Sequence, residues 1–405
     1  MTLTLLLDLD DTLLINNIER FIPAYMQSLS WYLQELVDPG LLVKELLSAT
    51  RRMIQNDRPD CTLQEIFEET FYPAIGVEPE ELQQPIAQFY GTIFPTLRHL
   101  TQPQPGAIKL VEEAFERGYR VGIATNPLFP LTAIQQRLEW AGLSPAKYPF
   151  EAIASFENYH FAKPNPALFM EMLARMGWPE GPIVMIGDSR GNDILPALQA
   201  GLKAYWINPN GKTKIESPGQ YFSGSISGAL AWLNQIDQEH RQLEFTSISG
   251  NLAILKATPA FIDYLSRQTD QLDTWTIRPQ EDEWCQTEIF CHLRDVEEEV
   301  NLPRITKMLA ENNPFLPGKD TDQWAAERQY LCQDGQAATH RFITARIKLI
   351  EKLKALPEEA WNRPARHSIF GPTSLIELVR IIAGHDRLHI HQIYTTRNTV
   401  LTTAK

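Results

Sequence analysis

The sequence has few cysteines, no long apolar run and no excess of positive charge. Its 4 cysteines are scattered over 405 residues and none forms a C-x-x-C pair, which favours a reducing, cytoplasmic setting over a disulfide framework. No uninterrupted apolar segment is long enough to cross a bilayer, so we expect no membrane-spanning helix. The apolar run at residues 3–7 is broken by Asp8 and follows no basic stretch, so we interpret it as a strand rather than a secretory signal.

Acidic residues outnumber basic ones, 50 to 37, and the formal net charge is -13. This charge repels phosphate backbones and anionic membrane surfaces, so we expect neither nucleic acid nor membrane as a partner. A small molecule is the favoured partner, and the sequence leaves an oligomer open. An apolar content of 43% fits a globular protein, and 405 residues exceed one ordinary core, so we expect at least two domains.

The first part of the chain, residues 1–236, alternates short apolar runs with amphipathic helical stretches. That pattern is typical of an α/β doubly wound parallel sheet. A long helical segment without strand-like alternation interrupts it at about residues 16–100, and we interpret this segment as an inserted helical cap. The apolar runs expected to form strands are residues 3–7, 120–124, 152–155, 183–186 and 203–207.

After a linker expected at residues 237–246, the character of the sequence changes. Residues 247–400 contain four amphipathic stretches separated by Pro and Gly breaks, and no convincing strand. We therefore expect an all-α four-helix bundle. The four stretches are residues 259–272, 282–312, 323–356 and 373–396.

Three acidic residues follow directly on the first apolar run, in the stretch LLLDLDDTLL. Packed carboxylates repel one another and lose hydration, so Asp8, Asp10 and Asp11 need a compensating cation or a chemical role. Residues two apart in a strand point the same way, and we expect Asp8 and Asp10 to project together where the strand ends. Ligands of open parallel sheets bind at the carboxyl ends of the strands, which makes this a candidate site.

Three later strand ends carry matching polar side chains. GIATNP contributes Thr125 and Asn126, FAKPNPALF contributes Lys163, and VMIGDSRGND contributes Asp188 and Asp193. A hard divalent cation held by oxygen ligands would neutralise the carboxylates, and Lys163 would add fixed positive charge. The small donors Thr125 and Asn126 could hold the oxygens of an anionic group.

These four motifs, in this order, resemble the haloacid dehalogenase-like hydrolase superfamily over roughly the first 235 residues. The resemblance implies a Rossmann-like core with a mobile cap and a Mg2+-dependent phosphatase acting on a small phosphorylated metabolite. Asp8 would be the nucleophile that forms an aspartyl-phosphate. Asp10 would protonate the leaving oxygen and then activate water. An acid at this second position is what separates the phosphatases of the superfamily from its dehalogenases.

The resemblance also implies roles for the other motif residues. Thr125, Asn126 and Lys163 would bind the phosphoryl group, and Lys163 would also stabilise the nucleophile and the intermediate. Asp188, with Asp193 behind it, would hold Mg2+ together with Asp8 and the main-chain carbonyl of Asp10. One departure is Asp11, which stands where many members carry Gly.

The last amphipathic stretch contains IIAGHDRLHIHQI, in which His385 and His389 lie one helical turn apart and share a face. His292, in EIFCHLRDVEEE, lies on another expected helix that a bundle can bring across its core. A bundle with these histidines resembles the DinB-like superfamily over nearly all of residues 247–398. The resemblance implies that the three histidines bind a second divalent metal, Zn2+, Ni2+ or Fe2+, and Asp386, Asp295 or Glu299 could orient them.

Three hypotheses follow from the two halves of the chain. The first is a phosphatase fused to a metal-binding bundle. The second makes the bundle the working half, as a metal-dependent hydrolase or thiol transferase, with the first domain accessory to it. The third is a module that binds phosphate compounds without turnover, against which the intact pair Asp8 and Asp10 argues.

Overall fold

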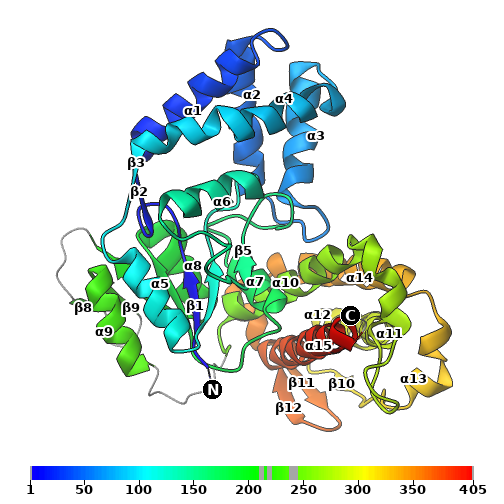
Figure 1. Ribbon diagram of the computed structural model, residues 1–405. Coiled ribbons are helices and arrows are strands. Elements are labelled where there is room, and N and C mark those ends of the chain that lie inside the picture. The colour runs from blue at the N-terminus through cyan, green and yellow to red at the C-terminus, as the bar shows by residue number, and fades with distance from the viewer. Residues whose placement is uncertain (1, 209–213, 217–220, 237–244, 404–405) are drawn as a thin grey trace. The chain divides into compact units, whose positions relative to one another are not determined.

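A computed structural model describes residues 2–208, 214–216, 221–236 and 245–403 of the chain (Figure 1). Its contacts divide the chain into two compact units that meet in sequence at residues 244 and 245. Two short stretches, residues 58–60 and 173–178, are grouped with the second unit. Of the linker expected at residues 237–246, residues 237–244 lie outside the described residues.

The first unit is built on a seven-stranded sheet with the order β5-β4-β1-β6-β7-β9-β8 (Figure 1). All neighbouring strands run parallel except β8, which pairs antiparallel with β9. Strand β1 is fully buried, as its run of leucines predicts for a strand covered on both faces. The strands are β1 (Thr4–Leu7), β4 (Arg120–Ile123), β5 (Ala152–Ile153), β6 (Ile183–Gly187), β7 (Lys203–Ile207), β8 (Lys214–Glu216) and β9 (Tyr221–Gly224).

Amphipathic helices connect the strands, and the predicted α/β doubly wound fold is confirmed. Helix α5 illustrates the pattern on which the prediction depends. Its apolar residues recur at helical spacing and form one buried face, made of Ala107, Leu110, Val111 and Ala114. The expected strands lie within two residues of the observed ones, whereas β8 and β9 were not anticipated. The helices are α5 (Ala107–Glu116), α6 (Leu131–Trp140), α7 (Ala167–Arg175), α8 (Leu195–Gln199) and α9 (Ile226–Ile236).

The cap, residues 16–100, is helical and lies beyond the carboxyl-terminal end of β1 (Figure 1). Three of its helices begin at a capping side chain, that of Asn17, Asp38 or Thr62. At Thr62 the hydroxyl accepts a bond from the Glu65 N–H, and the Glu65 carboxylate accepts one from the Thr62 N–H. A two-stranded antiparallel ribbon of β2 (Leu14–Asn16) and β3 (Thr101–Pro103) carries the chain into and out of the cap. The cap helices are α1 (Ile18–Tyr32), α2 (Pro39–Ile54), α3 (Leu63–Ile75), α4 (Pro79–Thr92) and the 3-10 helix η1 (Phe94–Leu100).

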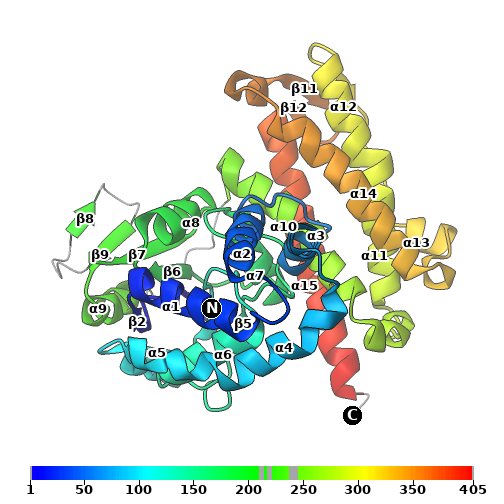
Figure 2. The same cartoon turned by 90° about the horizontal axis from the view of Figure 1, so that it is seen from above.

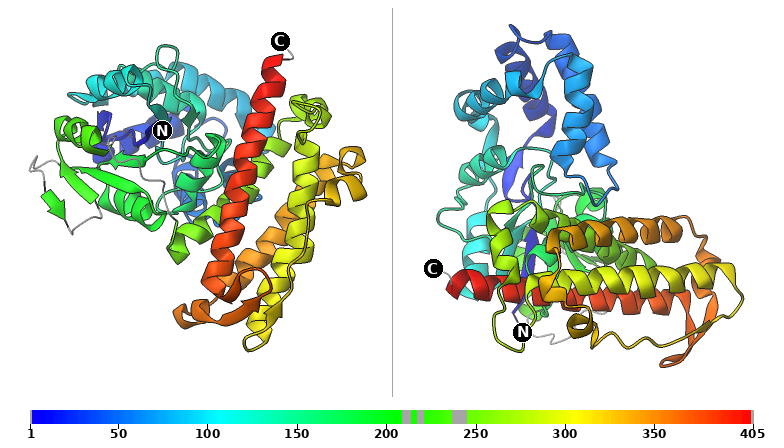
Figure 3. Two further views of the ribbon diagram at one scale, coloured as in Figure 1. Left: turned by 90° about the horizontal axis from the view of Figure 1, so that it is seen from below. Right: turned by 90° about the vertical axis from the view of Figure 1, so that its right-hand side faces the viewer.

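The second unit contains the predicted four-helix bundle (Figures 2 and 3). Its first helix, α10 (Ile248–Ser266), packs against α14 (Gly335–Lys354) and α15 (Leu375–Thr403). Helix α11 (Gln286–Val296) packs against the same two helices and continues through the π-turn η4 (Glu297–Asn301) into α12 (Leu302–Ala310). Helix α10 begins well before the expected residue 259 because Pro259 lies inside the helix instead of marking a break.

The expectation that residues 247–400 contain no strands is wrong. A three-stranded sheet pairs β10 (Phe315–Leu316), β11 (Pro364–His367) and β12 (Gly371–Ser374). The strands are only two to four residues long and two of them contain a proline, so the sequence offers too little pattern to identify them. Among the described residues, no helix is both long and apolar enough to cross a membrane.

Candidate functional site

The sheet places the first motif and its partners at one edge. Leu7, the last residue of β1, pairs with Ile123 of β4 on one side and with Ile186 of β6 on the other. The ladder continues one step further, because the Asp8 N–H donates to the Ile186 carbonyl at 3.0 Å. Three strands therefore end at nearly one level. Asp8 and Asp188 follow their strands directly, and Thr125 comes two residues after the end of β4.

Lys163 joins two of the predicted carboxylates. Its Nζ lies 2.6 Å from Asp8 Oδ1 and 2.5 Å from Asp193 Oδ1, and all three side chains are buried. The Asn126 side-chain oxygen accepts a bond from the Lys163 main-chain N–H at 3.1 Å and so fixes the loop that carries the lysine. Burial opposes the charge on the ammonium, but Asp193 and Asp8 outweigh it and raise the pKa of Lys163. Lys163 is therefore a fixed cation.

Asp193 is held in place by the loop after β6. Its Oδ2 accepts a bond from the Ser189 N–H at 2.9 Å, while its Oδ1 faces Lys163. The carboxylate lies so close to Gly187 that a Cβ built there would be 2.3 Å from Oδ2. A glycine is therefore required at the end of β6 for the carboxylate to occupy this position.

The cluster carries more negative than positive charge. Asp8, Asp188 and Asp193 each offer an oxygen, these atoms lie within 4.8 Å of one another, and Lys163 is their cation. Burial, together with the charges of Asp8 and Asp193, raises the pKa of Asp188 to about 7. A divalent cation bound by these oxygens would remove the repulsion, so the donor set fits Mg2+.

The other two acids of the first motif have different partners. Asp10 forms an ion pair with Arg137, and its Oδ1 also accepts a bond from Asn16 Nδ2 at 3.1 Å. Asp11 has a φ of 54° and accepts a bond from the Asn16 N–H at 2.8 Å. A left-handed backbone suits Gly best and is tolerated by Asp, which explains the departure noted in the sequence.

Arg137 is the residue near the site that the sequence analysis missed. It lies on α6, and its side chain is only 3% exposed. Helical spacing offers a signal, because Arg137 comes four residues after Ala133 and three after Ile134, on the buried face of α6. A charged residue on an apolar helical stripe indicates a buried partner.

The three predicted histidines of the bundle meet in space. His385 Nε2 lies 3.2 Å from His292 Nε2 and 3.1 Å from His389 Nε2, so three ring nitrogens converge on one point. The Trp284 ring covers the group, with its centroid 5.1 Å from that of His292. Burial and the neighbouring imidazoles lower the pKa values of His292 and His385 to about 3. These rings are therefore neutral at pH 7, the state in which histidine binds a metal.

The orienting contact comes from a residue that was not predicted. Gln392 Oε1 lies 2.9 Å from His389 Nδ1, so this nitrogen carries the proton and Nε2 is left to face the other two rings. The Asp386 carboxylate, in contrast, accepts bonds from Thr258 and from the buried guanidinium of Arg346.

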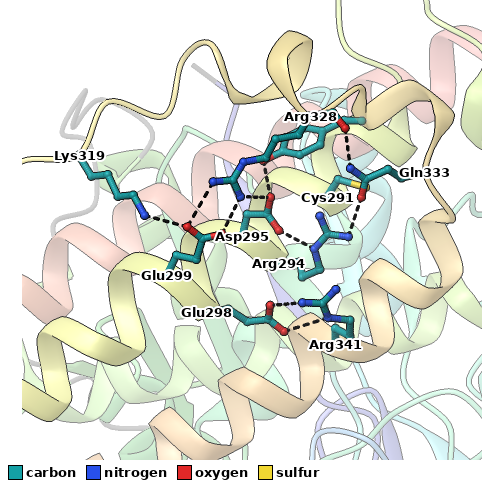
Figure 4. Close-up of polar contacts among 10 residues, drawn as sticks. Cys291, Arg294, Asp295, Glu298, Glu299, Lys319, Arg328, Gln333 and Arg341 are labelled. Carbon is teal, nitrogen blue, oxygen red and sulfur yellow. Dashed lines mark hydrogen bonds and ion pairs between the residues drawn. The ribbon is translucent and has the colours of Figure 1, made fainter.

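The remaining two candidate acids belong to an ion-pair network on α11 and η4 (Figure 4). Arg328 reaches Asp295 Oδ2 at 2.5 Å and Glu299 Oε1 at 2.6 Å. Lys319 also pairs with Glu299, and Arg294 pairs with Asp295. Both carboxylates thus tie the segment after α12 to the bundle, and their hydrogen bonds do not go to the histidines.

Two family models match the chain. The haloacid dehalogenase-like hydrolase model matches residues 2–201, and the DinB superfamily model matches residues 255–393. Curated relatives match parts of the chain. They include the pyrimidine 5'-nucleotidase YjjG of Escherichia coli, 30% identical over 36% of this chain and 60% of its own length.

Two further relatives are phosphatases. The glyceraldehyde 3-phosphate phosphatase of Methanothermobacter thermautotrophicus is 30% identical over 27% of this chain and 46% of its own length. The N-acylneuraminate-9-phosphatase of Homo sapiens is 35% identical over 22% of this chain and 37% of its own length. The chain thus spans 60% or less of the length of these three relatives.

Solved structures also match parts of the chain. A HAD phosphatase of Thermococcus onnurineus is 20% identical and covers 60% of this chain and 100% of its own, with a TM-score of 0.38. YfiT of Bacillus subtilis, described with an unusual four-helix bundle topology, is 15% identical and covers 40% of this chain and 91% of its own, with a TM-score of 0.34. From the two family models, the chain joins a haloacid dehalogenase-like hydrolase domain, matched at residues 2–201, to a domain of the DinB superfamily, matched at residues 255–393.

Proposed function

We propose that the first unit is a Mg2+-dependent phosphatase that hydrolyses a small phosphorylated metabolite through an aspartyl-phosphate. The observation that carries the proposal is the position of the Lys163 ammonium between Asp8 and Asp193, at the edge where Asp188 also lies. A carboxylate nucleophile held beside a fixed cation is suited to attack on phosphorus, because the charge gathered on the phosphoryl oxygens is offset in advance.

Two steps account for the reaction. An Asp8 oxygen attacks phosphorus, the bond to the leaving oxygen breaks, and a protonated Asp10 gives its proton to that oxygen to release an alcohol. Water then attacks the phosphorus of the aspartyl-phosphate and gives a proton to the Asp10 carboxylate, so phosphate leaves and Asp8 is restored. Thr125 and Asn126 would bind the phosphoryl group; their position after β4, at the same edge of the sheet, supports this role.

Asp8 and Asp188, with the main-chain carbonyl of Asp10 and with Asp193 behind them, would hold Mg2+. When bound, this ion offsets negative charge on the phosphoryl group and on the carboxylates around it. The raised pKa of Asp188 supports the assignment, because burial and the charges of Asp8 and Asp193 both disfavour its carboxylate unless a cation binds there.

The relatives support the substrate class no further than a phosphate monoester. Their names refer to a nucleotide, a triose phosphate and a sugar acid phosphate, which share the phosphoryl group and little else. We propose a small phosphorylated metabolite on this basis.

The second candidate function belongs to the bundle. Three neutral imidazoles whose Nε2 atoms converge favour a transition metal such as Zn2+, Ni2+ or Fe2+, and three protein ligands leave coordination positions open. We propose that this unit binds such a metal, as a metal-dependent hydrolase or thiol transferase would require.

Phosphate release from a panel of phosphorylated metabolites, with and without Mg2+, tests the first function. The wild type should release phosphate only with Mg2+, and Asp8→Asn should fall to background because an amide oxygen is a poor nucleophile. The matched control is Asp38→Asn, at the exposed N-cap of α2 in the cap, which should keep full activity. Equal release by the wild type and by Asp8→Asn would contradict the proposal.

A further inference from the structure

Arg137 is a buried cation at a place where a cation is costly. Its guanidinium carbon lies 5.7 Å from the centroid of the Phe21 ring and 5.3 Å from that of the Phe129 ring. Its Nε is buried and has no hydrogen-bond partner. Removing an arginine from water costs several kcal/mol in proteins, so this position calls for a strong compensating contact.

The compensating contact is the carboxylate of Asp10. Arg137 pairs with Asp10 Oδ1, and Asn16 Nδ2 donates to the same oxygen. The two partners come from different parts of the unit, because Arg137 is on core helix α6 and Asn16 is on ribbon strand β2. Two donors, Arg137 and Asn16, thus hold the Asp10 carboxylate, which lies beyond the end of β1 at Leu7.

The Phe21 and Phe129 rings restrict the movement of the guanidinium. Phe21 belongs to the first cap helix, α1, and Phe129 to the loop that leads from β4 to α6. Two neighbouring aromatic rings hold a planar guanidinium by stacking and cation–π attraction. The guanidinium is therefore a rigid anchor, and its rigidity passes to the carboxylate that it binds.

We propose that Arg137 is a positioning residue that holds the Asp10 carboxyl group where it meets the leaving oxygen of the substrate. This inference rests on the proposed phosphatase function and deepens it. Proton transfer to a leaving oxygen matters most when that oxygen is strongly basic, because an acidic leaving group departs as an anion without help. Loss of Arg137 should therefore lower kcat/KM most for the substrates whose leaving groups are most basic.

A series of aryl phosphates of similar shape, from 4-nitrophenyl phosphate through phenyl phosphate to 4-methoxyphenyl phosphate, measures this dependence in the full-length protein with Mg2+. The quantity to compare is kcat/KM, which reports the steps up to loss of the leaving group and not the later hydrolysis. The wild type should show a shallow dependence on leaving-group basicity. In Arg137→Met, kcat/KM should fall about 10- to 100-fold with 4-methoxyphenyl phosphate and less than about threefold with 4-nitrophenyl phosphate.

Three further variants separate positioning from packing. Arg137→Lys keeps a cation and should recover part of the loss, and it also serves if Arg137→Met does not fold. Leu138→Ala, which truncates a buried side chain on the same helix, should lower kcat/KM for all three substrates by one common factor. In the Asp10→Asn background, adding Arg137→Met should cost nothing more with 4-methoxyphenyl phosphate, because the anchor then has no acid to position.

An equal loss for all three substrates in Arg137→Met, or a further loss in the double variant, overturns the assignment while the phosphatase function stands. If the wild type itself hydrolyses none of the aryl phosphates and no metabolite of the panel, the proposed function fails and the role of Arg137 fails with it. A steeper leaving-group dependence in Arg137→Met, absent from Leu138→Ala, supports the assignment.

Discussion

Lys163 Nζ donates to Asp8 Oδ1 at 2.6 Å, although the two residues are 155 positions apart in the chain. The bond joins the end of β1 to the loop before α7, and the same ammonium also binds Asp193. One cation thus joins its own loop to two other segments, whose carboxylates would otherwise repel each other.

We predict that Lys163→Met destabilises the first unit and inactivates it. The variant keeps most of the side-chain volume but leaves buried carboxylates without their cation, which should cost about 3–5 kcal/mol of the free energy of unfolding. Catalysis should fall by about 100- to 1,000-fold, the cost of one lost electrostatic contact to the transition state. Thermal unfolding and phosphate release measure the two effects.

The matched control is Lys147→Met, which removes an exposed lysine that pairs with Glu112. An exposed pair contributes about 0.2–1 kcal/mol, so this variant should keep nearly the full stability and activity. Mg2+ should also raise the melting temperature of Lys163→Met more than that of the wild type, because the ion replaces part of the missing charge. Equal stability of the two variants would be inconsistent with the central position of Lys163.

Gly187→Ala should displace Asp193. The added Cβ would lie 2.3 Å from Asp193 Oδ2, and the carboxylate must move away from the Ser189 N–H and from Lys163. A displacement of about 1 Å at a catalytic constellation can cost about 100-fold in rate, and we expect a loss of this order in kcat. Gly191→Ala, in the same loop but with nothing within 4 Å of the added Cβ, should remain close to wild type. Similar losses in the two variants would contradict the argument.

The parts of the site that the sequence predicts are those for which a general rule connects residues far apart in the chain. Parallel strands end at a common edge, so Asp8 and Asp188 could be placed together from their positions after apolar runs. The same logic does not reach Asp10, because β1 ends at Leu7 and Asp11 adopts a left-handed backbone. Beyond the strand the two-residue alternation no longer fixes side-chain directions, and the pairing of Asp10 with Arg137 is visible only in the structure.

In the bundle, helical spacing predicts that His385 and His389 share a face, but spacing within one helix cannot identify a partner on another. The orienting contact shows this limit, since Gln392 is one of many polar residues on α15, and only its 2.9 Å contact with His389 distinguishes it. Two of the three acids suggested as orienting residues, Asp295 and Glu299, are instead bound to arginines.

His385→Ala should remove the metal from the bundle. His385 Nε2 is the nitrogen that lies near both other ring nitrogens, so its loss leaves two ligands on different helices. Elemental analysis of full-length protein purified without chelators should find a transition metal in the wild type and little in this variant. His340→Ala, which removes an exposed histidine of α14, should keep the metal.

Gln392→Leu provides a graded test of the same centre. It removes only the contact to His389 Nδ1, and loss of such an orienting bond should lower metal affinity about 10- to 100-fold. A competition titration with a chromophoric chelator measures the change. Unchanged metal content in His385→Ala would refute the three-histidine assignment, whatever the affinity of Gln392→Leu.

The ion pairs of Arg328 should make the segment after α12 sensitive to acid. Hydrogen bonds from Arg328 and Lys319 lower the pKa of Glu299 to about 2, and although burial opposes it, bonds from Arg294, Arg328 and Tyr330 lower the pKa of Asp295. A carboxyl group whose pKa is lowered by folding contributes stability at pH values above its unfolded pKa. That contribution is lost as the pH falls toward the folded value.

Arg328→Met should therefore weaken the attachment of residues 319–334 at pH 7, by about 1–3 kcal/mol for hydrogen bonds to charged groups. The variant and the wild type should differ less in the free energy of detaching this segment as the pH falls below about 4.5. Glu299 and Asp295 then take up protons in the detached state, so the ion pairs stabilise the wild type less. Hydrogen exchange of this segment at matched pH measures the effect. Arg341→Met, which breaks the more exposed pair with Glu298, should change exchange of the segment much less, and a difference for Arg328→Met that stays constant down to pH 3 would show that the ion pairs are not its source.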